Sequence, residues 1–218
     1  MKERGMIFNA EMVRAILDGR KTQTRRIMKN QPVLNGNFYE VFGAGWSKGM
    51  TSVPAMPGHS LSAKCPYGAA GDRIWVRETW AEAGASAPDL KLYRANYPDH
   101  VPSSYENVPP ANEILWTPSI HMPRWASRIL LEITDVRVER LNAISQADAI
   151  AEGAPPSHPS IDCVSQEYGF PDFSRSWFGQ TWQHIYGADS WRASPWVWVI
   201  EFKVVPNVPA NSTGSDLR

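Results

Sequence analysis

The chain has little cysteine and no excess of charge of either sign. Its 218 residues include two cysteines, Cys65 and Cys163, and 22 basic residues balance 22 acidic ones. Neither cysteine belongs to a CxxC pair, so the sequence indicates neither a zinc site nor a disulfide framework. A net charge of zero argues against a bulk electrostatic grip on duplex DNA. Any contact with nucleic acid therefore requires a local basic patch.

Long apolar runs are absent as well. No stretch approaches the length that spans a membrane, and no apolar segment of a signal peptide follows the charged residues 1–5. The five histidines are too dispersed for the spacing of metal ligands. We therefore expect a cytoplasmic protein with no membrane contact, no metal and no other cofactor, and the sequence leaves its oligomeric state open.

Among the features that are present, residues 19–26, GRKTQTRR, concentrate side-chain donors more than any other stretch. They follow a predicted helix over about 10–18, for which Asn9 is a good N-cap and Gly19 a typical C-terminal stop. The spacing of apolar residues in this helix matches one buried face. The basic stretch therefore begins at a helix end, and we expect it to continue as an extended segment.

Lys21 is the candidate for chemistry in this stretch because it lies among three other cations, Arg20, Arg25 and Arg26. Neighbouring positive charges disfavour the protonated form, so we expect the pKa of Lys21 to be lowered. A lysine that acts as a general base or nucleophile needs such a shift. The alternative is an ordinary solvated basic loop. Thr24 adds a hydroxyl, although a threonine in an extended segment is unremarkable.

The rest of the chain predicts a small α+β fold. Alternating apolar residues indicate strands over 6–8, 73–77, about 127–138, with a change of phase at Asp135, and 196–205. Helices are expected over about 146–152, where Ser145 and Asp148 form a capping box, and over about 172–187. The predicted helix over 172–187 has Phe178, Trp182 and Ile185 on one side, and the strand over 196–205 has one apolar and one mixed face. Two loop-rich insertions, a loop and a disordered tail complete the prediction, over 27–70 (with a hairpin around 37–41), 81–118, 154–171 and 206–218. We expect one domain over 1–205, with a curled antiparallel or mixed sheet flanked by helices.

Glu152 is the second candidate for chemistry. It lies in the last turn of the predicted helix over 146–152, where the negative end of the helix dipole disfavours a carboxylate. A misplaced carboxylate is either an acid or base of a site or is held by a nearby cation such as Lys21. A solvated surface glutamate is the alternative. Glu78, which follows the strand over 73–77, is expected to pair with an arginine.

Aromatic and basic residues elsewhere form a candidate ligand surface. Ten tryptophans are a high number, which could serve the core, but an aromatic excess also suits a surface on which bases stack. Four tryptophans lie near loop starts, where they could stack a base: Trp75, Trp80, Trp116 and Trp125. The predicted ligand-binding residues are Trp75, Arg77, His121, Arg124 and Trp125, together with Arg20, Arg25 and Arg26 of the basic stretch. Core packing and an ordinary loop histidine are the alternatives.

These blocks together resemble the ASCH domain, which is similar to the PUA domain and shares its small β-barrel. The resemblance is carried by GRKTQT after a capped helix, by GDRIWV at 71–76, by the short helix that ends at Glu152, and by WVIEF at 198–202. It covers about 6–205 as separated blocks, and the insertions exceed the minimal domain. Longer versions with the SIHMPRWASR segment resemble proteins of phages and prophages, in which case the compartment is the host cytoplasm.

The resemblance implies recognition of RNA, single-stranded nucleic acid or a modified nucleotide in a basic cleft of the barrel. One bacterial branch of the family deacetylates 4-acetylcytidine with a lysine, a threonine and a glutamate, which map to Lys21, Thr24 and Glu152. Other members resemble ribonucleases or plain nucleic-acid binders. This chain departs from the amidohydrolase branch at Arg25 and Arg26, which keeps the substrate open. The expectations are therefore a recognition domain first, an amidohydrolase second and a ribonuclease third.

Overall fold

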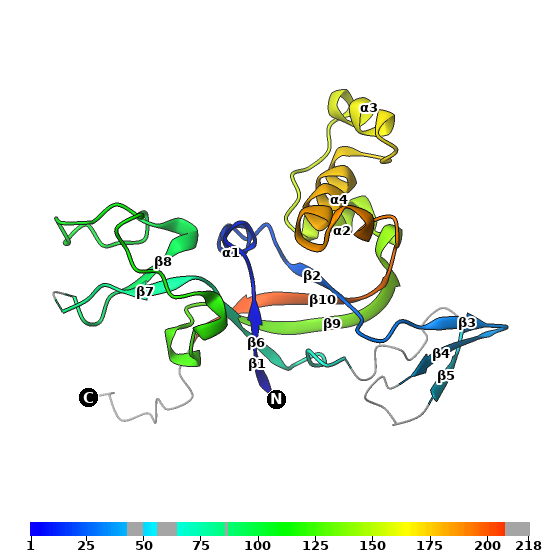
Figure 1. Cartoon of the computed structure of the whole chain (residues 1–218), viewed down its shortest axis with the longest axis horizontal. Helices are drawn as coiled ribbons and strands as arrows, with labels where there is room; N and C mark the ends of the chain where they lie inside the picture. Colours follow the sequence, from blue (N-terminus) through cyan, green and yellow to red (C-terminus); the bar gives the residue numbers. More distant parts are fainter. Residues whose placement is uncertain (43–49, 56–64, 86, 208–218) are drawn as a thin grey trace. The chain divides into compact units, whose positions relative to one another are not determined.

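The structure is a computed structural model that describes residues 1–42, 50–55, 65–85 and 87–207 (Figure 1). The α-helices of these residues are α1 (Ala10–Leu17), α2 (Gln146–Ala151), α3 (Pro159–Glu167) and α4 (Phe173–Tyr186). The strands are β1 (Glu3–Ile7), β2 (Gln23–Ile27), β3 (Val33–Asn35), β4 (Phe38–Phe42), β5 (Met50–Pro54), β6 (Arg73–Arg77), β7 (Trp80–Glu82), β8 (Lys91–Tyr93), β9 (Leu130–Arg140) and β10 (Trp196–Val205). The predicted α+β class is confirmed.

The main sheet has five strands in the order β1-β6-β9-β10-β2. Strands β1 and β6 are parallel, whereas β6 pairs with β9 and β10 pairs with β2 in antiparallel fashion. A barrel needs its first and last strands to pair, and in the described residues the order ends at β1 and β2 without closing. The sheet is therefore mixed and open, and the predicted β-barrel is wrong for this part of the chain.

The chain divides into two compact units. Unit 1 consists of Met1–Asp18, Asp72–Glu132 and Lys203–Arg218, and unit 2 consists of Gly19–Gly71 and Ile133–Phe202. The long strands β9 and β10 contribute residues to both units. The single domain over 1–205 stays a prediction. Of the predicted disordered tail over 206–218, residues 208–218 lie outside the described residues.

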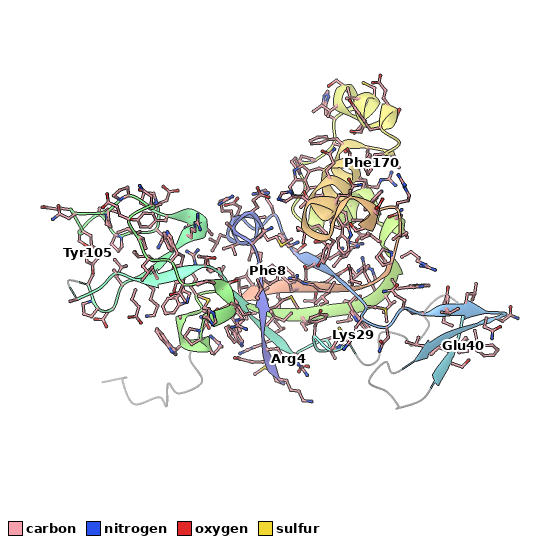
Figure 2. All side chains as sticks on the ribbon, viewed as in Figure 1. Arg4, Phe8, Lys29, Glu40, Tyr105 and Phe170 are labelled. Carbon is pink, nitrogen blue, oxygen red and sulfur yellow. The ribbon has the colours of Figure 1, made fainter. Side chains whose placement is uncertain are left out.

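Unit 1 is built on α1, β1 and β6. The side chain of Asn9 accepts a hydrogen bond from the backbone N–H of Met12, which confirms the predicted N-cap of α1. Strand β6 has the predicted bounds, and its alternate residues Ile74 and Val76 are buried. The first strand ends at Ile7 rather than at residue 8, although Phe8 itself is buried beyond the strand end (Figure 2).

Unit 2 has its core between helices α2 and α4 and strand β10. Phe178 and Trp182 of α4 pack in one buried cluster with Val197 and Val199 of β10. Helix α4 confirms the predicted helix, with Asp172 as its N-cap and Gly187 as its C-cap. The predicted apolar face does not extend to its end, because Ile185 is exposed.

The predicted strand over 196–205 is confirmed as β10, but its two faces differ from the prediction. Both Val197 and Val199, on the face expected to be mixed, are completely buried. Val204, on the face expected to be apolar, is exposed. Helices α2 and α4 therefore cover the face of β10 that carries Val197 and Val199, although this face also includes polar residues in the sequence. The expected change of phase in the preceding strand is confirmed, since Ile133 and Val138 of β9 are both buried across an odd sequence interval.

The predicted insertions contain more regular structure than expected. Within 27–70, strands β3, β4 and β5 form an antiparallel sheet, and the pairing of Asn35 with Phe38 confirms the predicted hairpin. Within 81–118, β8 pairs with β7. Strands of three to five residues are too short to show a periodicity that a sequence pattern could reveal. In Figure 2, Glu40 marks β4 of the first of these segments.

The predicted loop over 154–171 is wrong because α3 lies within it. His158 caps this helix through a hydrogen bond from Ser160, and Pro159 occupies its first turn. Its apolar residues Ile161 and Val164 are exposed, so no buried stripe signals the helix in the sequence. Phe170, labelled in Figure 2, follows α3 and packs so closely on α4 that a Cβ at Gly179 would lie 2.6 Å from its ring.

Candidate functional site

Lys21 is held between the end of α1 and the start of β2. Gly19 adopts a φ of 72°, a left-handed conformation that favours glycine and turns the chain out of the helix. Thr22, the residue after Lys21, donates from its backbone N–H to the carbonyl of Ala151 at 2.8 Å. Its backbone carbonyl accepts from the N–H of Phe202 at 2.9 Å. These two hydrogen bonds place Lys21 beside the C-terminal end of α2.

The side chains of Lys21 and Glu152 form a buried ion pair. The Nζ of Lys21 lies 2.6 Å from Oε2 of Glu152 and also donates to the backbone carbonyl of Glu152 at 2.9 Å. The exposed fractions of the two side chains are 0% and 3%. Two residues 131 positions apart are therefore joined by a charge-assisted hydrogen bond that is closed to solvent. This pairing with a cation was one of the expectations for Glu152, and the alternative of a solvated surface glutamate is wrong because the residue is buried.

Glu152 is the C-cap residue of α2 rather than a member of its last turn. The helix begins with the predicted capping box, in which Ser145 accepts from the backbone of Asp148 and the carboxylate of Asp148 accepts from Ser145. The backbone N–H of Glu152 closes the helix on the carbonyl of Asp148 at 2.9 Å. A carboxylate at this end faces the negative pole of the helix, so it needs cations beside it.

Arg25 is the second cation that holds Glu152. Its Nη1 lies 3.3 Å from Oε1 of Glu152, and its Nη2 lies 3.2 Å from Glu139 and 3.4 Å from Asp148. The guanidinium carbon also lies 5.8 Å from the ring centroid of Phe178. The Arg25 side chain is 0% exposed. In this structure three carboxylates surround the guanidinium of Arg25, and its predicted contact with a ligand stays a prediction.

Arg137 extends this network and was not predicted. It contacts Glu139 at 2.5 Å, Asp148 at 2.7 Å and the side-chain oxygen of Gln23 at 3.2 Å, and it also pairs with Glu201. Cations and carboxylates are close to balance in this partly buried ionic network of unit 2, and the basic cleft stays a prediction. The signal that was available is the polar alternate face of β9, where Arg137 and Glu139 are two residues apart.

The pKa of Lys21 is lowered. Burial of the ammonium group is the main cause, Glu152 opposes it, and the positive charges of Arg26 and Arg25 add to it. The expected direction is confirmed, but the expected cause was the neighbouring cations alone, which contribute least. A buried lysine with a lowered pKa and a carboxylate partner can lose and regain a proton, which an arginine in the same place cannot do.

Thr24 is buried, but the structure does not bring it to the Lys21–Glu152 pair. Side chains alternate along a strand, so Gln23 and Arg25 share one face of β2 and Thr24 lies on the other. Its neighbour across the sheet is Ile200 of β10. Lys21 and Glu152 therefore meet, whereas the third predicted catalytic residue lies on the opposite face of the sheet.

The remaining basic residues of the stretch lie nearer the surface. Arg20 is exposed and donates to the carbonyl of Gly153 at 3.2 Å. Arg26 is half-buried on the same face of β2 as Thr24.

A separate cavity of about 490 Å³ in unit 2 has none of the predicted site residues in its lining, which consists of Lys29, Asn30, Gln31, Val33 and Glu40. Lys29 and Glu40 mark it in Figure 2.

The five other predicted ligand residues belong to unit 1. The guanidinium of Arg77 lies 5.4 Å from the ring centroid of Trp75. Arg124 pairs with Glu3 at 3.0 Å, and Trp125 and His121 are exposed. The expected pair of Glu78 is also found in this unit, where Arg128 binds both of its carboxylate oxygens at 2.9 Å.

In the described ranges, no group of three or more histidine, cysteine or acidic residues is placed to hold a metal ion. The helices of these ranges also lack the combination of length and apolar character that crossing a membrane requires. No protein-family model, no curated protein and no solved structure matches the chain.

Proposed function

We propose that this chain is an ASCH-type, PUA-like protein that recognises a modified nucleoside, free or within RNA or single-stranded nucleic acid, and hydrolyses an amide on it. The observation that carries the proposal is the buried pair of Lys21 and Glu152. These residues stand at the two places that the resemblance assigns to the amidohydrolase branch. Apolar residues of similar volume often stabilise a fold as well as a buried ion pair does or better, so such a pair is a candidate for function.

The pair has the chemistry that amide hydrolysis needs. The step requires that substrate binding admits water to the closed pair and that Lys21 is in its neutral form, which its lowered pKa favours; Lys21 then accepts a proton from that water as the water oxygen attacks the acyl carbon. The bond between the acyl carbon and the exocyclic nitrogen then breaks, and the nitrogen takes the proton as it leaves. Glu152 holds the ammonium in the interval, and Arg25 fixes the other oxygen of Glu152. The products are a carboxylate and the unmodified nucleoside.

Recognition without catalysis is the second candidate, and two observations favour it. The Nζ of Lys21 is closed to solvent, and Thr24 lies on the opposite face of β2. In that case the ionic network fixes the end of α2 to β2, and exposed cations such as Arg20 contact the ligand. The two candidates differ in whether Lys21 is needed for turnover or for structure alone.

The test is turnover of 4-acetylcytidine and related acylated nucleosides, measured as release of the deacylated nucleoside. We expect Lys21→Met and Glu152→Gln to lose roughly 100-fold or more, the usual contribution of a positioned acid or base. Lys29→Met is the matched control, because this lysine is exposed in the same unit. Thr24→Val should cost less than either variant, since Thr24 lies away from the pair.

Turnover by folded Lys21→Met protein would contradict the catalytic assignment. If the wild-type protein turns over none of the acylated nucleosides, the recognition candidate replaces it. Salt-sensitive binding of RNA that Arg20→Ala and Arg26→Ala weaken would then support recognition.

A further inference from the structure

We propose that Gln23 is a further catalytic residue of unit 2, whose side-chain amide donates a hydrogen bond to the acyl oxygen of the substrate. The inference rests on the proposed hydrolysis, and it adds the group that stabilises the negative charge formed in that reaction. Neither the basic character of residues 19–26 nor the resemblance points to Gln23. The argument for it comes from the hydrogen bonds of its amide and from its place beside Lys21.

The amide of Gln23 is buried, and half of its hydrogen-bonding capacity is used. The residue is 2% exposed, and its Oε1 accepts a hydrogen bond from Nη2 of Arg137 at 3.2 Å. A guanidinium has donors and no acceptor, so the amide atom that faces it is the oxygen. Among the residues that the structure describes, the amide nitrogen has no hydrogen-bond partner. A buried donor without an acceptor destabilises a fold and therefore calls for a functional explanation.

Gln31, in the same unit, is a glutamine with a structural role and differs in this respect. Its Oε1 accepts from the backbone N–H of Trp196 at 2.7 Å. Its Nε2 donates to the carbonyls of Met28 at 2.7 Å and of Trp196 at 3.1 Å. Both ends of the Gln31 amide thus hold backbone, although this residue is exposed to water. Gln23 is closed to water and uses one end alone.

Gln23 lies on the same side of the chain as Lys21. The pairing of β2 with β10 continues past Gln23, because the carbonyl of Thr22 accepts from Phe202. Thr22 is exposed, whereas its two neighbours are buried, as side-chain alternation along an extended segment requires. Residues two positions apart in such a segment are separated by about 6.6 Å. A reacting group that lies about 3 Å from a base and about 3 Å from an oxygen donor fits a separation of this size.

The ionic network is more exposed at the end where Gln23 is bonded. The side chain of Lys21 is 0% exposed, whereas those of Arg137 and Glu201 are 28% and 41% exposed. Gln23 is opposite Glu201 in the register of β2 with β10, and it contacts Arg137. The acyl group of the substrate enters from this end, where it separates Arg137 from Glu201 and meets the amide nitrogen of Gln23.

The reaction needs a donor for the acyl oxygen. As the water oxygen attacks the acyl carbon, the electron pair of the carbonyl bond moves onto the acyl oxygen, and Lys21 takes the proton of the water. The N–H of Gln23 stabilises the negative charge on that oxygen. The carbonyl bond forms again when the bond from the acyl carbon to the exocyclic nitrogen breaks, and this nitrogen takes the proton from Lys21.

Arg25 carries a second buried donor of the network without an acceptor among the described residues, its Nε. The same guanidinium holds Glu152, so a change at Arg25 would disturb the Lys21–Glu152 pair as well. Gln23 makes no printed contact with either member of that pair, and its oxygen contacts Arg137. A change at Gln23 therefore tests donation to the substrate more cleanly.

Two substitutions separate donation to the substrate from support of Arg137. Gln23→Glu keeps an oxygen for Arg137 and loses the N–H donor, whereas Gln23→Met loses both. We expect kcat for 4-acetylcytidine to fall about 100-fold or more in both variants, with a much smaller change in KM, the usual result of removing a donor that acts in the transition state. Gln166→Met, at an exposed glutamine of α3, is the matched control and should keep the wild-type kcat.

The pH profile completes the test, and circular dichroism checks that each variant is folded. A negative charge at position 23 that acted through Lys21 would raise the pKa of the lysine, so the kcat of Gln23→Glu would recover at higher pH. Loss of a donor gives no such recovery. Recovery of this kind, wild-type kcat in Gln23→Glu, or a rise in KM with unchanged kcat would each overturn the proposal. The hydrolysis itself would still stand if Lys21→Met had lost turnover. If the wild-type chain releases no deacylated nucleoside, both proposals fall.

Discussion

Among the described residues, each unit contains a buried glutamate that pairs with a cation, and the two pairs are built differently. In unit 1, Arg128 grips both oxygens of Glu78 at 2.9 Å, donates to Asn96 and lies 4.1 Å from the ring centroid of Tyr93. In unit 2, Glu152 is shared between Lys21 and Arg25, one oxygen each. Arginine stays charged under all ordinary conditions, whereas a buried lysine can give up its proton.

The difference indicates what each pair is for. The fork of Arg128 matches the carboxylate of Glu78 bidentately, which is an arrangement that favours structure. Lys21, whose pKa is lowered, contributes a single ammonium group to the carboxylate of Glu152, which is also paired with Arg25. If Lys21 lost its proton, Arg25 would remain as a cation beside Glu152, whereas Arg128 cannot lose its charge.

The largest effect is expected from breaking the pair in unit 1. In Arg128→Met, Glu78 would remain buried and, among the residues the structure describes, without a second cation in contact. Leaving one partner of a buried pair alone costs about 3–5 kcal/mol of the free energy of unfolding. Urea denaturation followed by circular dichroism measures it. The surface variant Arg192→Ala should change the free energy by less than about 0.5 kcal/mol, and a similar value for Arg128→Met would contradict the comparison.

Lys21→Met should cost less, about 1–3 kcal/mol, because Arg25 still compensates the charge of Glu152, although Oε2 and the backbone carbonyl of Glu152 both lose the donor that Lys21 supplies. The effect should also depend on pH. The folded pKa of Lys21 is lower than its ordinary 10.5, so between the two values the unfolded chain binds the proton and the folded chain does not. Stability therefore rises with pH in this window.

The same denaturation experiment, repeated at increasing pH, tests the sign. The free energy of unfolding of the wild type minus that of Lys21→Met should increase as the pH approaches 10.5 from below. A difference that stays flat or falls would show that Lys21 keeps its proton in the fold, and the assignment of Lys21 as a base would lose its support.

Local signals in the sequence located individual residues of the site rather than the contacts that surround them. The capping box, the helix stop and the basic run located Lys21 and Glu152, because caps and turns depend on residues a few positions apart. The burial of Arg25 was missed because Glu139 and Glu152 are 114 and 127 residues away. A run of basic residues such as 19–26 suggests a solvated loop when the carboxylates that pair with it lie far away in the sequence.

The same reason explains the errors in the fold. The sequence located strand β10 and helix α4 to within a residue or two, because the apolar repeat that marks each element lies within that element. The order of the strands could not be predicted in the same way, because strand pairing joins β1 to β6 and β2 to β10 across most of the chain. The open sheet was therefore mistaken for a barrel, and α3 was missed because exposed apolar residues leave no buried stripe.

The smallest effect concerns Tyr93, which lies beneath Arg128 in unit 1. Its hydroxyl donates to the carbonyl of Ala126 at 2.9 Å, so Tyr93→Phe should cost about 1 kcal/mol of the free energy of unfolding. Burial, helped by the charge of Glu78 and opposed by Arg128, raises the pKa of Tyr93 to about 12.

The sign of the pH dependence is then opposite to that of Lys21. Between the ordinary value of 10.0 and about 12, the folded chain keeps the phenolic proton and the unfolded chain releases it, so stability falls as pH rises. The free energy of unfolding of the wild type minus that of Tyr93→Phe should shrink over this range, because the other tyrosines cancel in the difference. A difference that grew would mean that Tyr93 ionises readily in the fold, which a phenol sealed against the Arg128–Glu78 pair should not do.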